Sequence, residues 1–225
     1  MINIFILPAP SKIFLSFFEI LKSGELFQNM TVSLLRVGIG FGLASIIAIP
    51  LGFCMALNLT SRNFLFPFFN FFRPIPPIAW MPLAILWFGI GHGPAVFLTM
   101  IAALFTILFS TMMGVEEISK EHLNIARCFQ ASKWLTFKEV IFPASFPSLF
   151  HGLRMGFGLS WMAVVGAEMI ASTSGLGHMI NVAQDSLRTD IVIIGMFTIG
   201  FTAYFCDFIF KKIGAHFMIW RDYRA

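Results

Sequence analysis

Long apolar stretches separated by short polar connections dominate the pattern of this chain. A helix that crosses the hydrocarbon core of a bilayer needs roughly 20 apolar residues. Stretches of that length fall at residues 32–57, 64–90, 94–114, 145–171 and 191–210. The pattern therefore predicts an all-α membrane protein with five spans.

Prolines interrupt the second stretch, at Pro74, Pro76, Pro77 and Pro82. Because proline cannot donate a helical hydrogen bond, the first half of this span should be kinked or irregular. Irregular backbone at membrane depth is tolerated only where it is buried in protein or lines a cavity. Residues 73–87 are therefore a candidate pore element, and a plain kinked helix is the alternative.

The N-terminal residues 1–30 do not form a clear span. Lys12, Glu19 and Lys22 are mixed with apolar residues, and a cationic n-region followed by a small-residue cleavage site is missing. This pattern argues against a signal peptide. We expect an interfacial amphipathic segment here, and a sixth span is the less favoured alternative.

Residues 120–143 are the one long polar segment between the apolar stretches. Apolar side chains recur in it at steps of three or four residues, at Leu123, Ala126, Phe129 or Gln130, Trp134 and Phe137. This spacing predicts a helix with one apolar face. Such a helix either lies among the lipid headgroups or docks on a partner protein, and periodicity gives both interpretations equal weight.

Composition agrees with a membrane protein. Hydrophobic residues make up 58% of the chain, charged residues make up 12%, and the mean hydropathy is +0.85. These values exclude a soluble globular domain. The net charge of +4 is small and its residues are scattered, which argues against a nucleic-acid partner.

The basic residues predict an orientation, because cytoplasmic loops are enriched in Lys and Arg. The loop 115–144 and the end of the chain hold eight of the 15 basic residues, and these eight are Lys120, Arg127, Lys133, Lys138, Lys211, Lys212, Arg221 and Arg224. We therefore expect this loop and the tail 215–225 in the cytoplasm. The N-terminus and residues 172–190 then lie outside, and the transmembrane domain at 31–214 crosses the cell (inner) membrane several times.

No pattern typical of an enzyme site occurs in the chain. Gly is nowhere followed by Lys, so the loop that cradles ATP phosphates is missing. No group of His, Cys or acidic residues has catalytic or metal-ligand spacing. We expect no catalytic residue, metal or cofactor, and any driving nucleotide must bind to another chain.

Glu168 is the only acidic residue deep inside a predicted span. A charge at mid-membrane costs about 2.5–3.5 kcal/mol, so such a residue faces protein or water. Glu168 therefore either lines a pathway or packs by hydrogen bonds against a neighbouring span.

Asp207 lies one turn before Lys211 and should pair with it. Gly38 and Gly42 have the spacing of closely packed membrane helices.

The polar segment resembles the cytoplasmic loop of binding-protein-dependent ABC importer permeases. In that family, a Glu-Ala-Ala motif, a Gly four residues after the last Ala and a terminal Ile-x-Leu-Pro recur at fixed spacing. Here Asn124, Ile125 and Ala126 occupy the first positions, Gln130 occupies the Gly position, and VIFP at 140–143 supplies the ending. ARCFQAS and FPASFPSLFHGLRMGFGLSW are also similar to the family, and RPIPPIAWMPLAILWFG is close to a hallmark of its nitrate/sulfonate/taurine branch.

This resemblance covers nearly the whole chain. It implies a five-span ABC importer permease core with a cytoplasmic coupling helix, working as a homodimer in the lipid. The partners it implies are cytoplasmic ABC ATPase subunits and an external substrate-binding protein, periplasmic or lipoprotein. The implied ATPase-coupling residues are Leu123, Asn124, Ala126, Arg127, Phe129, Gln130, Ala131 and Ser132. For the translocation path we name Pro76, Trp80, Trp161 and Glu168.

Two positions depart from the loop signature, since Asn124 removes its acid and Gln130 removes its Gly. Gly allows a tight bend, so Gln indicates a continuous helix, an adapted partner or weaker coupling. The branch implies a small solute such as a sulfonate, taurine or nitrate, and relatives that import thiamine-precursor pyrimidines share its motifs. An ATP-independent secondary transporter or channel and a membrane enzyme are the rival classes.

Overall fold

A computed structural model describes residues 8–217, except for the side chain of Arg127. Residues 1–7 of the predicted N-terminal segment (1–30) and residues 218–225 of the predicted tail (215–225), with Arg221 and Arg224, lie outside the described residues. The described chain is helical, and its elements are α1 (Pro10–Ser23), α2 (Glu25–Leu57), α3 (Leu59–Phe72), η1 (Pro77–Trp80), α4 (Met81–Phe88), α5 (His92–Glu116), α6 (Lys120–Cys128), α7 (Lys133–Thr136), η2 (Phe137–Ile141), α8 (Phe142–Ala171), α9 (Leu176–Asp185) and α10 (Thr189–Phe217).

Within the described residues, four helical stretches are long and apolar enough to cross a membrane. These are α2, α5, α10 and the continuous run from α7 through the π-helical turn η2 into α8, over residues Lys133–Ala171. The second predicted span is broken, because the η1–α4 arm turns by 89° from α3 after the proline-rich segment. Counting this bent pair as one span gives the five that the apolar pattern predicts.

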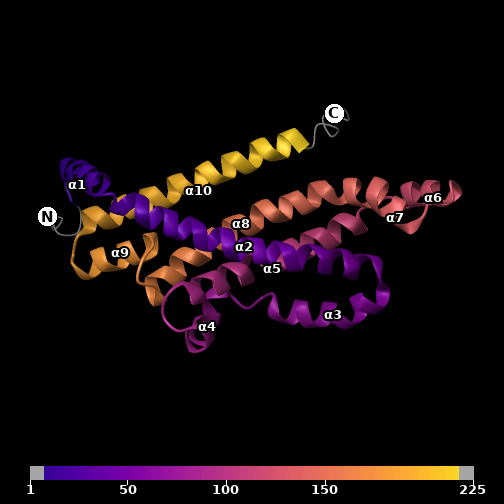
Figure 1. Cartoon of the computed structure of the whole chain (residues 1–225), viewed down its shortest axis with the longest axis horizontal. Helices are drawn as coiled ribbons and strands as arrows, with labels where there is room; N and C mark the ends of the chain where they lie inside the picture. The colour runs from indigo at the N-terminus through magenta and orange to yellow at the C-terminus, as the bar shows by residue number, and fades with distance from the viewer. Residues whose placement is uncertain (1–7, 218–225) are drawn as a thin grey trace.

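Helix α5 forms the centre of the bundle and packs between α2 and α8 (Figure 1). Small residues allow these close approaches. A Cβ at Gly52 would lie 2.7 Å from the Cβ of Thr111, and one at Gly114 would lie 2.9 Å from the carbonyl oxygen of Ser145. The predicted pair Gly38 and Gly42 has no neighbour of this kind within 4 Å, so the prediction of packing at these two positions is wrong for contacts within this chain.

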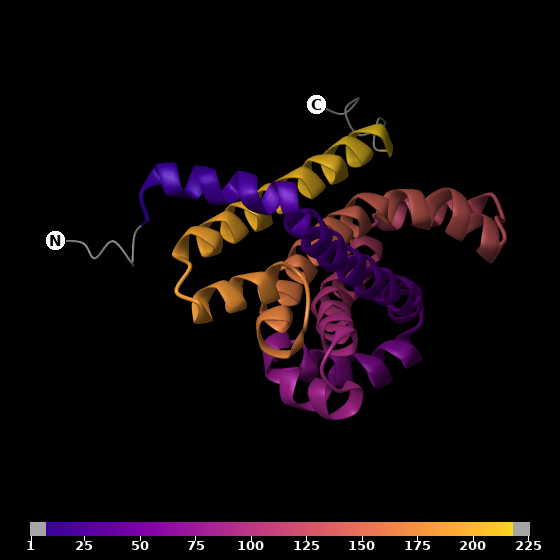
Figure 2. The same cartoon turned by 60° about the vertical axis from the view of Figure 1, so that its left-hand side comes forward.

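The connections gather at two opposite ends of the molecule (Figures 1 and 2). One end carries the α2–α3 turn, α6, α7 and the last turns of α10. The other end carries α1, α9 and the α4–α5 turn. With the bent pair counted as one span, five candidate crossings lie between α1 and the end of α10.

Helix α1 lies in the predicted amphipathic segment and packs against α2 and α10. Ile20 is buried, and Ile13 and Phe17 pack against the same cluster. The Ser16 hydroxyl donates a 2.6 Å hydrogen bond to the carboxylate of Asp190 at the start of α10. This helix is therefore tied to the bundle by specific contacts. Its predicted position at the lipid interface stays a prediction.

Candidate docking loop and transport path

The helix predicted within residues 120–143 is in fact divided by a tight turn into α6 and α7, and α7 begins the long helical run that continues through α8. Helix α6 ends at Cys128, and Gln130 has a positive φ of 51°. The amide of Ala131 donates a 3.0 Å hydrogen bond to the carbonyl of Ala126 and closes the turn. Ser132 then caps α7, since its hydroxyl accepts the amide of Leu135 at 3.2 Å. The interpretation of Gln130 as part of a continuous helix is therefore wrong.

The backbone at Gln130 explains why the family signature has Gly at this position. A residue in the left-handed conformation, followed by an amide bonded five residues back, is the usual ending of a helix, and Gly fits it without strain. A residue with a side chain pays about 1–2 kcal/mol there. Gln130 keeps the bend that Gly would give, at the cost of this strain.

The segment formed by α6, α7 and the following η2 has an inner and an outer face. Leu123 and Phe137 pack inward on the cluster around Phe53, whose ring lies 5.2 Å from that of Phe137. Phe129 and Trp134 point outward and are 83% and 70% exposed. Exposed aromatic residues at the end of a bundle mark a docking or interfacial surface.

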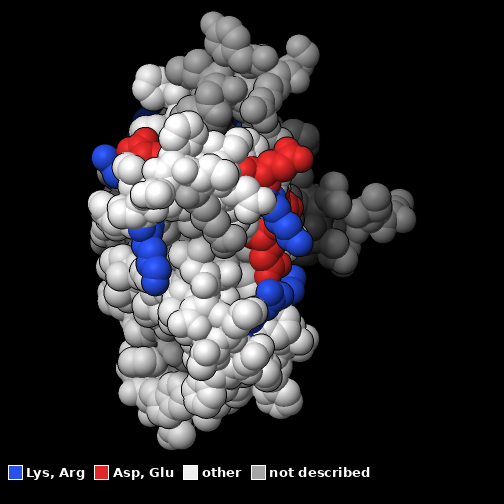
Figure 3. Space-filling model, turned by 90° about the vertical axis from the view of Figure 1, so that its right-hand side faces the viewer, with Lys and Arg blue, Asp and Glu red and all other residues white. Residues whose placement is uncertain are grey.

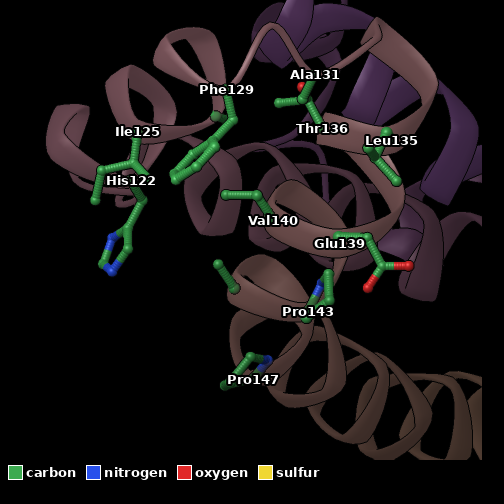
Figure 4. Close-up of a pocket in the computed structure, with 12 residues that line it drawn as sticks. His122, Ile125, Phe129, Ala131, Leu135, Thr136, Glu139, Val140, Pro143 and Pro147 are labelled. Carbon is green, nitrogen blue, oxygen red and sulfur yellow. The ribbon is translucent and has the colours of Figure 1, made fainter.

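Phe129 lines a hollow of about 790 Å³ between α6 and the start of α8, and Trp134 lies outside its lining. Figure 4 shows Phe129 and Val140 projecting into this space, with Pro143 and Pro147 of α8 along its floor. Charged side chains of both signs gather on this end of the molecule (Figure 3). A partner that fills the hollow would therefore meet an apolar centre with a charged border.

The structure distributes the predicted coupling residues over both faces. Asn124, Phe129, Gln130 and Ser132 are exposed, and Leu123 and Ala131 are half-buried. Ala126 is only 8% exposed and is covered by its own chain. The side chain of Arg127 lies outside the described residues.

Beside the broken second span lies another hollow, of about 560 Å³, walled by the 73–78 segment, α5 and α8. Pro76 lines this hollow and is exposed. Trp80 is half-buried, and its ring lies 5.8 Å from that of Phe72. Trp161 is 3% exposed and donates its indole N–H to the carbonyl of Ile199. Of the predicted path residues, only Pro76 therefore meets this space.

Glu168 is fully buried and takes part in an ion pair that the sequence did not predict. Its carboxylate lies 2.7 Å from the guanidinium of Arg36 on α2. It also accepts hydrogen bonds from the Ser33 hydroxyl and from the amide of Gly177 on α9. Arg36 further donates to the carbonyl of Ser174 at 2.6 Å. These contacts agree with the expectation that Glu168 packs by hydrogen bonds against a neighbouring span. They join α2, α8 and α9.

A second ion pair joins α8 to α10. Arg154 holds the carboxylate of Asp207 with two nitrogens, at 2.5 and 3.0 Å. Lys211 lies 3.1 Å from the same carboxylate, as predicted from its spacing. Among the described residues, no group of three or more His, Cys, Asp or Glu side chains could hold a metal ion.

A bundle of apolar helices with a broken span, a hollow beside it and an exposed loop at one end defines a membrane transport subunit. The chain belongs to the family described as binding-protein-dependent transport system inner membrane component, whose model matches residues 48–217. Members of this family are the membrane subunits of ABC importers and not enzymes, and ATP is hydrolysed on a separate subunit.

Curated relatives agree with this assignment. A putative ABC transporter permease protein of Methanocaldococcus jannaschii is 39% identical over 203 residues, which is 90% of this chain and 76% of that protein. The taurine transport system permease protein TauC of Escherichia coli is 33% identical over 87% of this chain and 71% of its own length. A nitrate import permease protein of Synechocystis is 34% identical over 78% of this chain and 64% of its own length.

Solved structures show the same fold. A chain of the MetNI methionine ABC transporter, in an inward-facing conformation, aligns with a TM-score of 0.72 at 15% identity and covers 88% of this chain and 98% of that one. A chain of an amino acid ABC transporter aligns with a TM-score of 0.65 at 15% identity, over 89% and 96% of the two chains. The likeness confirms the predicted ABC importer permease fold.

Proposed function

We propose that this chain forms the membrane path for a small solute with an anionic group, of the sulfonate, taurine or nitrate class. The relatives named for taurine, nitrate and aliphatic sulfonate transport support this solute class. The proposal places selection of the individual solute mainly on an external binding protein. The chain itself supplies the path and the coupling to ATP hydrolysis.

In this proposal the end with α6 and α7 lies in the cytoplasm and meets the ATPase subunit. The single observation that carries it is the outward Phe129, 83% exposed beside the hollow between α6 and α8. A large exposed aromatic side chain at a water-facing end is the kind of anchor that partner proteins bury. The basic residues of the same loop favour this side of the membrane.

The connection between the loop and the path is direct. Residues Lys133–Ala171 form one helical run, so α7 and α8 move together when the loop is displaced. Glu117, after α5, accepts a 3.0 Å hydrogen bond from Ser148 of α8, which joins both sides of the loop. Leu159 and Met162 of α8 line the hollow beside the broken span. ATPase closure would therefore act on the path wall through α8.

We further propose that two copies of the chain face each other across the path. The hollow beside the broken span opens at the surface of the single chain and has Pro76 at its border. Pro76 stays in the proposed path. Trp161 and Glu168, which are buried, support the wall from behind, and Trp80 holds the bend of the broken span.

Replacing Phe129 tests the docking surface. We expect Phe129→Asp to abolish copurification of the ATPase subunit and ATP-dependent uptake in proteoliposomes, because a charge would have to be buried at the centre of the contact. Phe129→Leu is the matched control and should retain most of both. Ala126→Asp is a poorer probe, because Ala126 is covered by its own chain. Uptake by the chain without any nucleotide-binding partner would overturn the proposal.

A further inference from the structure

Arg73 differs from the other arginines inside the apolar part of the bundle. Arg36 and Arg154 each lie within hydrogen-bond distance of a carboxylate. Arg73, which follows α3, has no such partner among the described residues. Its guanidinium lies over the ring of Phe109, 4.7 Å from the ring centre.

The depth of Arg73 follows from the helices beside it. Arg62 and Glu116 form a 2.8 Å ion pair at the end of the bundle that carries α6. Arg73 follows Arg62 by 11 residues of nearly continuous helix, which is about 16 Å at 1.5 Å per residue. Phe109 precedes Glu116 by 7 residues, or about 10 Å on the same scale. Both estimates place Arg73 well inside a hydrocarbon core of about 30 Å.

A charge at this depth faces protein or water, and Arg73 borders the hollow of about 560 Å³ beside the broken span. Arg73 is the only charged residue among the described residues that line it. Ser110 and Met113 line both this hollow and a second one of about 580 Å³ that extends to Glu117 and His151. The two hollows adjoin at Ser110 and Met113, lie along α5 and α8, and are together called the groove.

We propose that Arg73 is the residue of this groove that recognises the anionic group of the transported solute. A guanidinium presents its donors in a planar fork that matches the oxygens of a sulfonate or nitrate. Stacking over Phe109 holds the plane of the guanidinium and leaves its N–H edges directed away from the ring. The proposal rests on the proposed function, because it assigns a residue to the path of that transporter.

A cysteine reporter measures the local charge preference directly. Met113 lies one turn after Phe109 on α5, lines both hollows and is 53% exposed. The full chain, assembled with its partners, would carry Met113→Cys with Cys54, Cys128 and Cys206 replaced by Ser. Two thiol reagents of similar size are compared, the anionic sulfonatoethyl methanethiosulfonate and the cationic trimethylammonioethyl analogue.

We expect Arg73→Gln to lower the anionic-to-cationic ratio of modification rates about tenfold, because the only positive charge among the described residues that line the same hollow as Met113 is removed. Arg73→Lys should keep most of the ratio. Arg62→Gln, which removes an arginine at the bundle end, is the matched control and should leave the ratio within about twofold. With this pattern, uptake of radiolabelled taurine or nitrate should fall in Arg73→Gln and partly recover in Arg73→Lys.

An unchanged ratio in Arg73→Gln would overturn the proposal, even if uptake were lost, because Arg73 would then only support the fold. Failure of both reagents to modify the thiol introduced by Met113→Cys, in every variant, would also overturn it, since the groove would be closed to water. The proposed function fails on a separate result, which is the absence of ATP-dependent uptake by the unmodified complex. The labelling ratio is measured without transport, so the two failures are distinguishable.

Discussion

The ion pair of Arg36 and Glu168 shows how a membrane interior holds charged side chains. Both are buried to 1% exposure or less, and each makes further hydrogen bonds to Ser33, to Ser174 or to the amide of Gly177. A buried pair of this kind gives little net stability, but removing one partner leaves an uncompensated charge. Its contacts join α9 to α2 and α8, so we expect the pair to hold α9 in place.

A double-mutant cycle tests this role. We expect Arg36→Met or Glu168→Leu alone to lower the free energy of unfolding by about 3–5 kcal/mol, since the remaining charge has no partner. The double variant should lose at least about 1 kcal/mol less than the sum of the two. Denaturant titration in mixed micelles measures each value.

The exposed pair of Arg62 and Glu116 provides the control, because both side chains are more than a third exposed. Arg62→Gln should cost no more than about 1 kcal/mol, as surface ion pairs usually do. Additive losses for Arg36 and Glu168 would mean that the two side chains act independently, against the geometry.

The packing between helices depends on particular small residues at close contacts. Gly40 of α2 faces Thr99 of α5, where an added Cβ would lie against the Thr99 hydroxyl and 2.7 Å from the carbonyl oxygen of Val96. Gly38, on the same helix, has nothing within 4 Å of an added Cβ. The two positions are therefore a matched pair for testing the approach of α2 to α5.

We expect Gly40→Ala to destabilise the protein by about 1–3 kcal/mol, because a methyl group would force α2 away from α5. Gly38→Ala should be neutral or slightly stabilising, because Ala has the higher helix propensity. Thermal unfolding of the purified protein in one detergent compares them. Equal losses at both positions would show that the α2–α5 contact is not the tight one.

The sequence predicted the spans well because apolar length and the prolines of 74–82 report directly on membrane crossing and on the break. It did not reveal the Arg36 partner of Glu168, although Arg36 also lies inside a predicted span. The two residues are far apart in the chain, so their pairing could be predicted only from the way in which α2 packs against α8. Helix α9 was missed because its ten residues lie in a segment expected to be an external loop.

The loop shows a different limit of sequence reasoning. Because Gln is a good helix former, a Gln at the Gly position of the family signature predicts a helix that continues without a break through residue 130. Ser132 was the available signal against this, because Ser is a frequent N-cap and starts α7. The family position of the Gly and the cap at Ser132 together would have predicted the turn at Gln130.

At the scale of the whole molecule, the two ends differ in ways that make sidedness testable. Cys128 of α6 is exposed at the end with the docking loop. Ser186, after α9, is exposed at the opposite end. A cysteine at each position therefore reports one side of the membrane, once Cys54 and Cys206 are replaced by Ser.

We expect a membrane-impermeant maleimide to label Cys128 in inverted membrane vesicles and not in right-side-out vesicles, because the basic loop belongs in the cytoplasm. With Cys128 also replaced, Ser186→Cys should give the reverse result. Labelling of Cys128 from outside would contradict the proposed orientation. Binding of the ATPase subunit should slow labelling of Cys128 and leave Ser186→Cys unaffected, since only the loop with Phe129 and Trp134 would be covered.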